Sequence, residues 1–154
     1  MNLHIFNCVM IFIIGLVFGS YYNVVGYRLP NKMSIVFPQS HCPNCNHKLN
    51  FYELIPVLSY IFLGGKCKKC KCKISFFYPF FELLTGILFL LCYLNFGINI
   101  EFFIAVTFVS VLIIISISDI KYYIIPDEVL IVGTIIILIL FGINTYLNDL
   151  GVVK

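Results

Sequence analysis

The sequence predicts an all-α polytopic membrane protein, with about four transmembrane helices and one small loop domain that carries four cysteines. Of the 154 residues, 61% are hydrophobic and only 11% are charged, and the mean hydropathy is +1.02. These proportions leave too few polar groups to coat a soluble globule of this length. In addition, four apolar segments are long enough to cross a bilayer core, which takes roughly 20 residues.

The first predicted span covers about residues 3 to 25. A cleaved signal peptide is the alternative. However, the segment before this span has no Lys or Arg, the apolar run is longer than the roughly 7 to 15 residues of a signal peptide, and no A-x-A site follows. Gly15 and Gly19 form a small-x-x-x-small pair that would let a neighbouring helix approach closely, although glycine is also common in ordinary membrane helices.

Three further spans are predicted, at about residues 77 to 94, 101 to 118 and 129 to 147. Pro79 lies in the first turn of the second span, and Glu82 follows it as a carboxylate that a helix dipole would favour near the N-terminal end. That interpretation needs no catalytic role for Glu82. Cys8 and Cys92 fall in apolar spans, where we expect them to pack as small hydrophobic residues.

The loop between the first two spans carries most of the positive charge. Eight of the ten Lys and Arg residues lie there, against one acid, Glu53; the eight are Arg28, Lys32, Lys48, Lys66, Lys68, Lys69, Lys71 and Lys73. By the positive-inside rule this loop faces the cytoplasm. The predicted organisation is a transmembrane helix at 1–26, a cytoplasmic cysteine domain at 27–76, two helices at 77–118, a cytoplasmic loop at 119–128, and a helix with a short outer tail at 129–154.

Four cysteines of this loop form two C-x-x-C pairs, Cys42 with Cys45 and Cys67 with Cys70. Each C-x-x-C turn presents two sulfurs from one side, so a chain that folds back can place four thiolates around one Zn²⁺. Because the cytoplasm is reducing, the pairs are better explained as metal ligands than as disulfides. Such a zinc would be structural, since four thiolates close its coordination sphere.

Several alternatives for the loop stay open. Cys72, His41 and His47 lie close enough to the pairs to replace one ligand. Unliganded thiols or a transient redox pair would fit two evenly built C-x-x-C turns less well. The lysines around the second pair also invite a nucleic-acid interpretation, but topology and attraction to anionic headgroups, worth about 1 kcal/mol per cation, already explain them. We therefore expect no nucleic-acid partner.

Asp119 directly follows an apolar run, and an ionisable group at the edge of a span is a candidate functional residue. A plain charged end of the third span is the alternative. In aspartic peptidases two carboxylates share one proton, so that one acts as base and the other as acid. Asp127 is a poor partner for Asp119, because Pro126 prevents one continuous helix from placing both on one face. A partner should come from another helix.

Five stretches resemble, in order and spacing, the N-terminal half of bacterial type IV prepilin peptidases, which are membrane aspartic peptidases of the A24 type. They are residues 19–30 (GSYYNVVGYRLP), 40–45 (SHCPNC), 53–60 (ELIPVLSY), 64–70 (GGKCKKC) and 78–86 (YPFFELLTG). Asp119, followed by Ile125, Pro126 and Asp127, is similar to the first catalytic aspartate of that family and its following I-P-D. The resemblance covers the whole chain.

The resemblance implies a bifunctional enzyme of the bacterial cytoplasmic (inner) membrane. Such enzymes cleave the leaders of type IV prepilins or pseudopilins and methylate the new N-terminus with S-adenosylmethionine. It also implies that Asp119 is a catalytic aspartate and that Gly65, before the second cysteine pair, takes part in methyl transfer. Both reactions face the cytoplasm, where the charge count places the cysteine loop and Asp119.

The family's second catalytic aspartate lies in a later G-x-G-D motif, which does not occur in residues 1–154. The sequence therefore predicts no leader cleavage by this chain alone. Three interpretations stay open. They are a shortened peptidase and methyltransferase; a surviving methyltransferase, or a half-enzyme completed by a separate subunit that supplies the second aspartate; and a non-enzymatic membrane zinc protein that binds prepilins or assembly partners. The expected partners are prepilin substrates and the lipid bilayer, and the sequence leaves the oligomeric state open.

Overall fold

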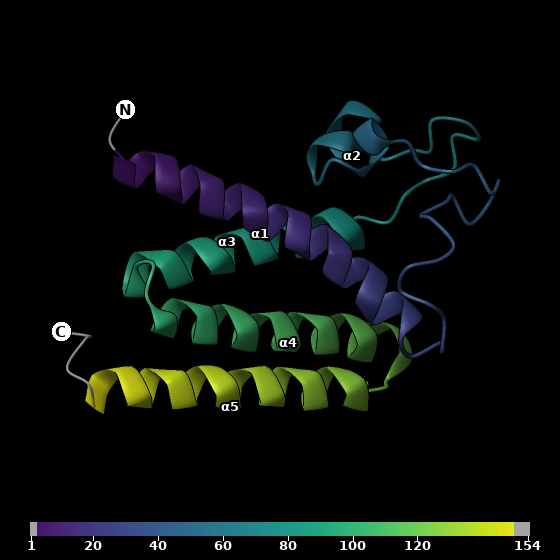
Figure 1. Cartoon of the computed structure of the whole chain (residues 1–154). Coiled ribbons are helices and arrows are strands. Elements are labelled where there is room, and N and C mark those ends of the chain that lie inside the picture. The colour runs from purple at the N-terminus through teal and green to yellow at the C-terminus, as the bar shows by residue number, and fades with distance from the viewer. Residues whose placement is uncertain (1–2, 150–154) are drawn as a thin grey trace.

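The computed structural model describes residues 3–149 and consists of four long helices with one irregular segment between the first two (Figure 1). Within these residues no strand forms, and the all-α prediction is confirmed. All four long helices are long and apolar enough to span a membrane. The elements are α1 (Leu3–Arg28), a 3-10 turn η1 (Phe51–Leu54), the short α2 (Leu58–Phe62), α3 (Phe77–Phe96), α4 (Ile100–Tyr122) and α5 (Asp127–Asp149).

The long helices run back and forth, as Figure 1 shows, and α1 crosses the layer formed by α3, α4 and α5. Helix α1 contacts α3 and α4, α3 contacts α4, and α4 contacts α5. The end of α1, the start of α3, the end of α4 and the start of α5 therefore lie at one end of the bundle. The irregular segment leaves and re-enters the bundle at this end, so its cysteines share that end with the last turn of α4 and the first turn of α5.

Glycines bring α1 and α3 into close contact. A Cβ atom added to Gly15 would lie 2.8 Å from the Cα of Gly86, and one added to Gly19 would lie 2.8 Å from the Cα of Glu82. Real Cβ atoms do not approach backbone so closely, so only glycine fits at these positions. The small-x-x-x-small pair of α1 is thus the contact surface for α3, as its sequence indicated.

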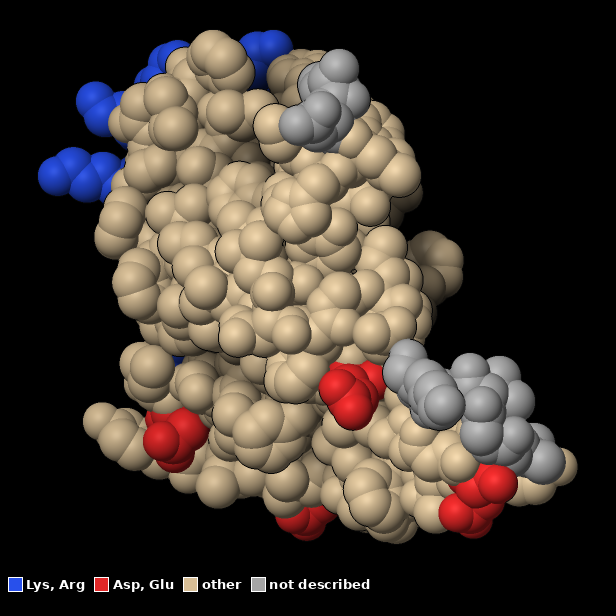
Figure 2. Space-filling view, turned by 90° about the vertical axis from the view of Figure 1, so that its left-hand side faces the viewer, with Lys and Arg blue, Asp and Glu red and all other residues tan. Residues whose placement is uncertain are grey.

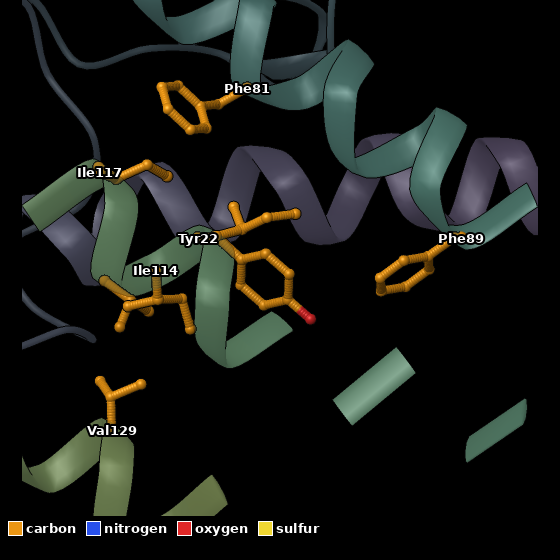
Figure 3. Close-up of a cluster of buried hydrophobic side chains, with 8 residues drawn as sticks. Tyr22, Phe81, Phe89, Ile114, Ile117 and Val129 are labelled. Atoms are coloured by element: carbon orange, nitrogen blue, oxygen red, sulfur yellow. The ribbon is translucent and has the colours of Figure 1, made fainter. Parts of the chain in front are cut away.

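A cluster of buried side chains lies between the helices (Figure 3). A hydrogen bond supports it, donated by the Tyr22 hydroxyl to the Ser110 hydroxyl at 2.7 Å, which joins α1 to α4. All four long helices contribute, so the cluster joins α5 to the rest of the bundle. Its members are Tyr22, Val25, Phe81, Phe89, Ile113, Ile114, Ile117 and Val129.

Two buried charged groups attach the irregular segment to the helices. The Arg28 guanidinium, at the end of α1, donates hydrogen bonds to the carbonyls of Ser34 and Pro38 at 2.9 and 2.6 Å. The Glu82 carboxylate of α3 accepts a hydrogen bond from the Val57 amide at 2.7 Å. Glu82 therefore has a specific partner in addition to the favourable position near a helix N-terminus that its sequence predicts.

The Glu82 contact also holds an unfavourable backbone in place. Val57 has φ of 60° and ψ of −49°, a conformation with positive φ that β-branched residues rarely adopt. A hydrogen bond to a charged group contributes about 1.5–3 kcal/mol, which is comparable with the cost of such a conformation. The bond between Glu82 and Val57 therefore fixes where α2 sits above α3.

The connection after α4 is shorter than the predicted loop at 119–128. Helix α4 continues to Tyr122, so Asp119 lies in its last turn. Tyr123 then takes a left-handed conformation, with φ of 56°, and its amide donates to the Asp119 carbonyl at 2.8 Å, which ends the helix. Asp127 begins α5 directly after Pro126. The helix thus ends four residues beyond the apolar run that bounded the predicted span, because it continues through the polar residues after that run.

The remaining boundaries differ in the same direction. Helix α1 extends to Arg28, α3 to Phe96 and α5 from Asp127 to Asp149, each beyond the apolar run that predicted it. Polar residues at a membrane surface keep their backbone hydrogen bonds within the helix, so a helix can outlast its apolar core. Most of the predicted outer tail falls on residues 150–154, outside the described part of the chain.

The surface of the bundle is largely uncharged. Figure 2, a view from the left-hand side of Figure 1, shows Lys and Arg at the upper edge and Asp and Glu toward the lower edge, with uncharged surface between them. On α5, Val132, Leu138 and Phe141 are each more than half exposed. Such exposed apolar surface is stable against lipid rather than water.

We predict opposite effects for the same substitution at two glycines. Gly19→Ala should lower the free energy of unfolding by about 1–3 kcal/mol, because its methyl group would meet the α3 backbone. Gly142→Ala, where no atom lies within 4 Å of the added Cβ, should be neutral or stabilising by up to about 1 kcal/mol, because alanine favours helix. Unfolding in mixed detergent, followed by circular dichroism, measures both. Equal effects would contradict the close α1–α3 contact.

Candidate metal centre and aspartate site

The first C-x-x-C pair lies in a tight turn. The Cys42 amide donates to the His47 carbonyl at 2.9 Å, and the Asn46 amide donates to the Cys42 carbonyl at 2.9 Å. Asn46 takes a left-handed conformation, with φ of 53°, which reverses the chain after Cys45. An isolated antiparallel bridge between His41 and Lys48 closes the turn.

The second pair repeats this turn. The Cys67 amide donates to the Cys72 carbonyl at 2.9 Å, and the Lys71 amide donates to the Cys67 carbonyl at 3.0 Å. Lys71 has φ of 59°, and Lys66 pairs with Lys73. The two turns are therefore equivalent, and Cys72 occupies in the second turn the place that His47 occupies in the first.

The two turns face one another through their sulfur atoms. The Sγ atom of Cys42 lies 3.8 Å from that of Cys70, and the Sγ atom of Cys45 lies 4.0 Å from that of Cys67. All four Sγ atoms lie within 4.8 Å of one another. In a tetrahedral site with metal–sulfur bonds of about 2.3 Å, the sulfurs are about 3.8 Å apart. The four cysteines can therefore hold one metal ion, as their spacing predicted.

The surroundings of three thiols favour the thiolate. Backbone amides of the turns hydrogen-bond the sulfurs: that of Asn44 is the main cause for Cys42, that of Cys70 for Cys67, and that of Cys72 for Cys70. Each of these three cysteines accordingly has a pKa below its ordinary value. The backbone amides of these turns therefore stabilise anionic sulfur ligands by themselves.

The other two thiols resist ionisation beside these anions. The pKa of Cys45 is raised to about 11. The His47 amide lowers this pKa, but burial and contact with the other sulfurs together raise it by more. The pKa of Cys72 is raised to about 12, first by its contact with the Cys70 sulfur and then by that with Cys42. A cation between the sulfurs would favour the thiolate form of each of its ligands.

The three alternative ligands have different surroundings. The Cys72 sulfur lies 3.1 Å from that of Cys70 and 3.5 Å from that of Cys42, so it touches the site. The His47 ring instead pairs with the Glu53 carboxylate at 3.4 Å, and the His41 ring bonds to the Gln39 carbonyl at 3.0 Å. Only Cys72 of the three joins the sulfur cluster.

Glu53 ties the first turn to η1. Its buried carboxylate accepts a hydrogen bond from the Asn50 amide at 2.8 Å and pairs with His47. The pKa of Glu53 is lowered, first by the Asn50 amide and then by the positive charge of His47. We did not predict this role from the sequence, although the N-x-x-E spacing of Asn50 and Glu53 is a capping-box signal that could have indicated it.

Asp119 is exposed in the last turn of α4, and an aromatic enclosure fixes that turn. The ammonium group of Lys121 lies 4.5 Å from the ring centre of Tyr78, 5.0 Å from that of Phe77 and 5.2 Å from that of Tyr27. It also donates to the Tyr78 hydroxyl at 3.2 Å. These contacts join the end of α4 to α1 and α3, so the backbone that carries Asp119 has a defined position.

Asp127 and Gly65 have the following positions. Asp127 is exposed in the first turn of α5, on a different helix from Asp119, as expected from the intervening proline. Gly65 has φ of 65°, and an added Cβ would lie 2.9 Å from the Tyr60 hydroxyl. Its carbonyl accepts the Ile74 amide at 2.7 Å, which closes the second turn. Gly65 is therefore required for the shape of the cysteine domain.

The fold and the sulfur cluster define a class: multi-pass membrane proteins with a four-cysteine domain between the first two long helices. Residues 13–96 match the model of the family described as the bacterial peptidase A24 N-terminal domain. This range begins within α1, includes the whole irregular segment and ends with α3. The chain therefore belongs to the A24 N-terminal domain family, and the family resemblance of its motifs is confirmed.

Two curated relatives are both named prepilin leader peptidase/N-methyltransferase. The chain is 48% identical to a prepilin leader peptidase/N-methyltransferase of Bacillus subtilis over 122 residues, which are 79% of this chain and 49% of the relative. The corresponding protein of Myxococcus xanthus is 42% identical over 125 residues, 81% of this chain and 37% of the relative. The chain thus spans about half of these relatives or less. No solved structure matches it.

We predict that Glu53→Gln speeds amide hydrogen exchange over residues 47–57 at neutral pH by roughly 10-fold or more, because a hydrogen bond to a charged group is lost. The pKa of Glu53 is lower in the folded chain. Its stabilisation is therefore complete above the unfolded value of about 4.3 and disappears as the pH falls through the folded value. Exchange in the two proteins should converge below that value.

Exchange measured by mass spectrometry and corrected for intrinsic rates tests this. Glu101→Gln, at the exposed start of α4, is the matched control and should leave residues 47–57 unchanged. A difference between Glu53→Gln and the unchanged chain that persists at low pH would contradict the role given to the carboxylate.

Proposed function

We propose that this chain is the N-terminal half of a prepilin leader peptidase/N-methyltransferase. The observation that carries the proposal is the family match over residues 13–96, which covers α1 from residue 13 onward, the cysteine domain and α3. The names of the relatives in Bacillus subtilis and Myxococcus xanthus support the same activity. The substrates would be type IV prepilins or pseudopilins, which are cleaved and then methylated at the new N-terminus.

Zinc is the proposed metal of the cysteine domain. Its ligands are Cys42, Cys45, Cys67 and Cys70, whose sulfur distances suit a tetrahedral ion. Because all four positions of the metal are then filled by sulfur, the ion has no open position for water and its role is structural. The irregular segment has little apolar core of its own, so metal binding would supply much of its folding free energy.

Asp119 is the proposed first catalytic aspartate. It is exposed at the same end of the bundle as the cysteine domain, in a turn that Lys121 fixes. In an aspartic peptidase the paired carboxylates hold the attacking water and protonate the scissile amide between them. The second carboxylate would come from another helix, in a part of the enzyme equivalent to the half of the relatives that this chain does not cover.

The proposed methyl donor is S-adenosylmethionine, which supplies an electrophilic methyl group. Gly65 is the residue of this chain that the family resemblance connects with methyl transfer. Its positive φ and its contact with Tyr60 support a positioning role, since both shape the turn that carries Cys67. Methyl transfer would then depend on the cysteine domain being folded around its metal.

The proposed location is the bacterial cytoplasmic membrane, with the cysteine domain and Asp119 on the cytoplasmic side. The distribution of positive charge supports this orientation, because Arg28 ends α1 and seven more of the ten Lys and Arg residues lie between α1 and α3. The structure adds that the end of α4 lies at the same end of the bundle as this segment. A soluble methyl donor would reach both from that side.

We predict about one zinc ion per chain after purification in detergent under reducing conditions. Cys42→Ser and Cys67→Ser should each lower the zinc content to less than about a tenth, because each replacement removes one of the four sulfur ligands. Cys92→Ser, in α3 and away from the cluster, is the matched control. Elemental analysis measures all three, and a zinc content near zero in the unchanged chain would contradict the proposal.

The peptidase proposal is tested with a chimera that joins this chain to the C-terminal half of the Bacillus subtilis relative. We predict that membranes with the chimera cleave a type IV prepilin. Asp119→Asn should lower the cleavage rate by at least about 100-fold, as expected for loss of a general acid or base. Glu101→Gln, at the opposite end of α4, should retain the rate.

Two outcomes would contradict this account. Cleavage by the chimera that survives Asp119→Asn would remove Asp119 from catalysis. Cleavage by the unextended chain that depends on Asp119 would show that the second carboxylate is within residues 1–154.

Label transfer from S-adenosylmethionine to a cleaved pilin, measured in the same membranes, should depend on Cys42 and Cys67. Transfer that survives both replacements would show that methylation does not need the metal.

A further inference from the structure

We propose that Cys70 and Cys72 exchange as the fourth ligand of the metal centre, so that five cysteines serve four positions. The inference rests on the proposed zinc site and extends it to a cysteine outside the two C-x-x-C pairs. The observation behind it is the place of the Cys72 sulfur, 3.1 Å from that of Cys70 and 3.5 Å from that of Cys42.

These distances place the Cys72 sulfur beside the corner of the site that Cys70 occupies. A tetrahedral ion with metal–sulfur bonds of about 2.3 Å requires its ligand sulfurs to be about 3.8 Å apart. The Cys42 sulfur is close to this distance from both candidates, 3.8 Å from Cys70 and 3.5 Å from Cys72. Cys70 and Cys72 are closer to each other than two ligands of one tetrahedral ion can be, so they compete for one position. The four sulfurs that lie within 4.8 Å of one another are those of Cys42, Cys45, Cys67 and Cys70, so Cys72 takes the fourth position only after its side chain rotates toward the other ligands.

The backbone presets this arrangement. The Cys72 carbonyl accepts the Cys67 amide at 2.9 Å, so Cys72 belongs to the turn that carries the second pair. Exchange between the ligands therefore requires side-chain rotation and no refolding of the turn. Cys72 gives up its thiol proton as it becomes a ligand, and Cys70 takes up a proton as it leaves, so the charge of the centre is unchanged.

The first turn provides an internal comparison. His47 occupies the place equivalent to Cys72, but its ring pairs with the Glu53 carboxylate at 3.4 Å. It is therefore directed to another partner and cannot replace Cys45 without breaking that pair. The two turns should differ in one respect: the second tolerates the loss of its last C-x-x-C cysteine, and the first does not.

The test compares equivalent substitutions in the chain of residues 1–154. Cys70→Ser should keep the zinc content of the unchanged protein, with an affinity in chelator competition reduced by less than about 10-fold. Cys45→Ser and the double variant Cys70→Ser/Cys72→Ser should lose more than about 100-fold in zinc affinity. This is beyond the roughly 10- to 100-fold loss that is typical when a residue that only contacts a ligand is replaced. With Co²⁺ in place of zinc, the thiolate-to-metal absorption should show four sulfurs in Cys70→Ser and three in the double variant.

A measurement on the unchanged chain removes the dependence on folding of the variants. After mild alkylation of the zinc-loaded protein, peptide mass spectrometry should find the label on Cys70 in some chains and on Cys72 in others, with few chains labelled at both. Label confined to Cys72 would make Cys70 the fixed ligand and overturn the exchange.

The outcomes separate this inference from the proposed function. Zinc present in the unchanged chain but lost from Cys70→Ser as completely as from Cys45→Ser would overturn only the role of Cys72. Absence of zinc from the unchanged chain would overturn the metal centre and the exchange together. Retention of zinc by Cys70→Ser and its loss from the double variant support both.

Discussion

The close contact of α1 with α3 is the constraint on which the rest of the structure depends. Gly15 and Gly19 let the backbones approach to a distance that no other residue allows. The irregular segment begins at the end of α1 and returns at the start of α3, so this contact fixes both of its ends. Arg28 and Glu82 then hold the segment from each side. A weaker helix contact would therefore loosen the cysteine domain although its own turns were unchanged.

The same end of the bundle gathers the groups that the family resemblance connects with chemistry. The sulfur cluster lies in the segment between α1 and α3, and Asp119 lies in the last turn of α4. The aromatic enclosure of Lys121 connects the two regions, because its rings come from α1 and α3 while the lysine comes from α4. The cysteine domain and the aspartate thus share one structural support.

Composition and spacing were sufficient to predict the four spans and the two cysteine pairs, because both depend on local sequence. The helix ends were not predictable in this way. At the end of α4, for example, the apolar run stops before Asp119, but the helix continues to Tyr122. Cys72 and His47 were equally placed in the sequence as spare ligands. In the structure they differ in their partners: the His47 ring pairs with the Glu53 carboxylate, whereas the Cys72 sulfur lies against the other sulfurs. The contacts of Glu82 with Val57 and of Lys121 with three rings join distant segments, so no local pattern indicates them.

In the proposed zinc site, sulfur alone closes the cysteine domain around one metal ion. X-ray absorption at the zinc edge of the purified chain can decide this, because it reports the identity and distance of the atoms bound to the metal. We expect four sulfur atoms at about 2.3 Å and no oxygen or nitrogen. Oxygen or nitrogen bound to the metal at about 2.0–2.2 Å would contradict a site made of sulfur alone.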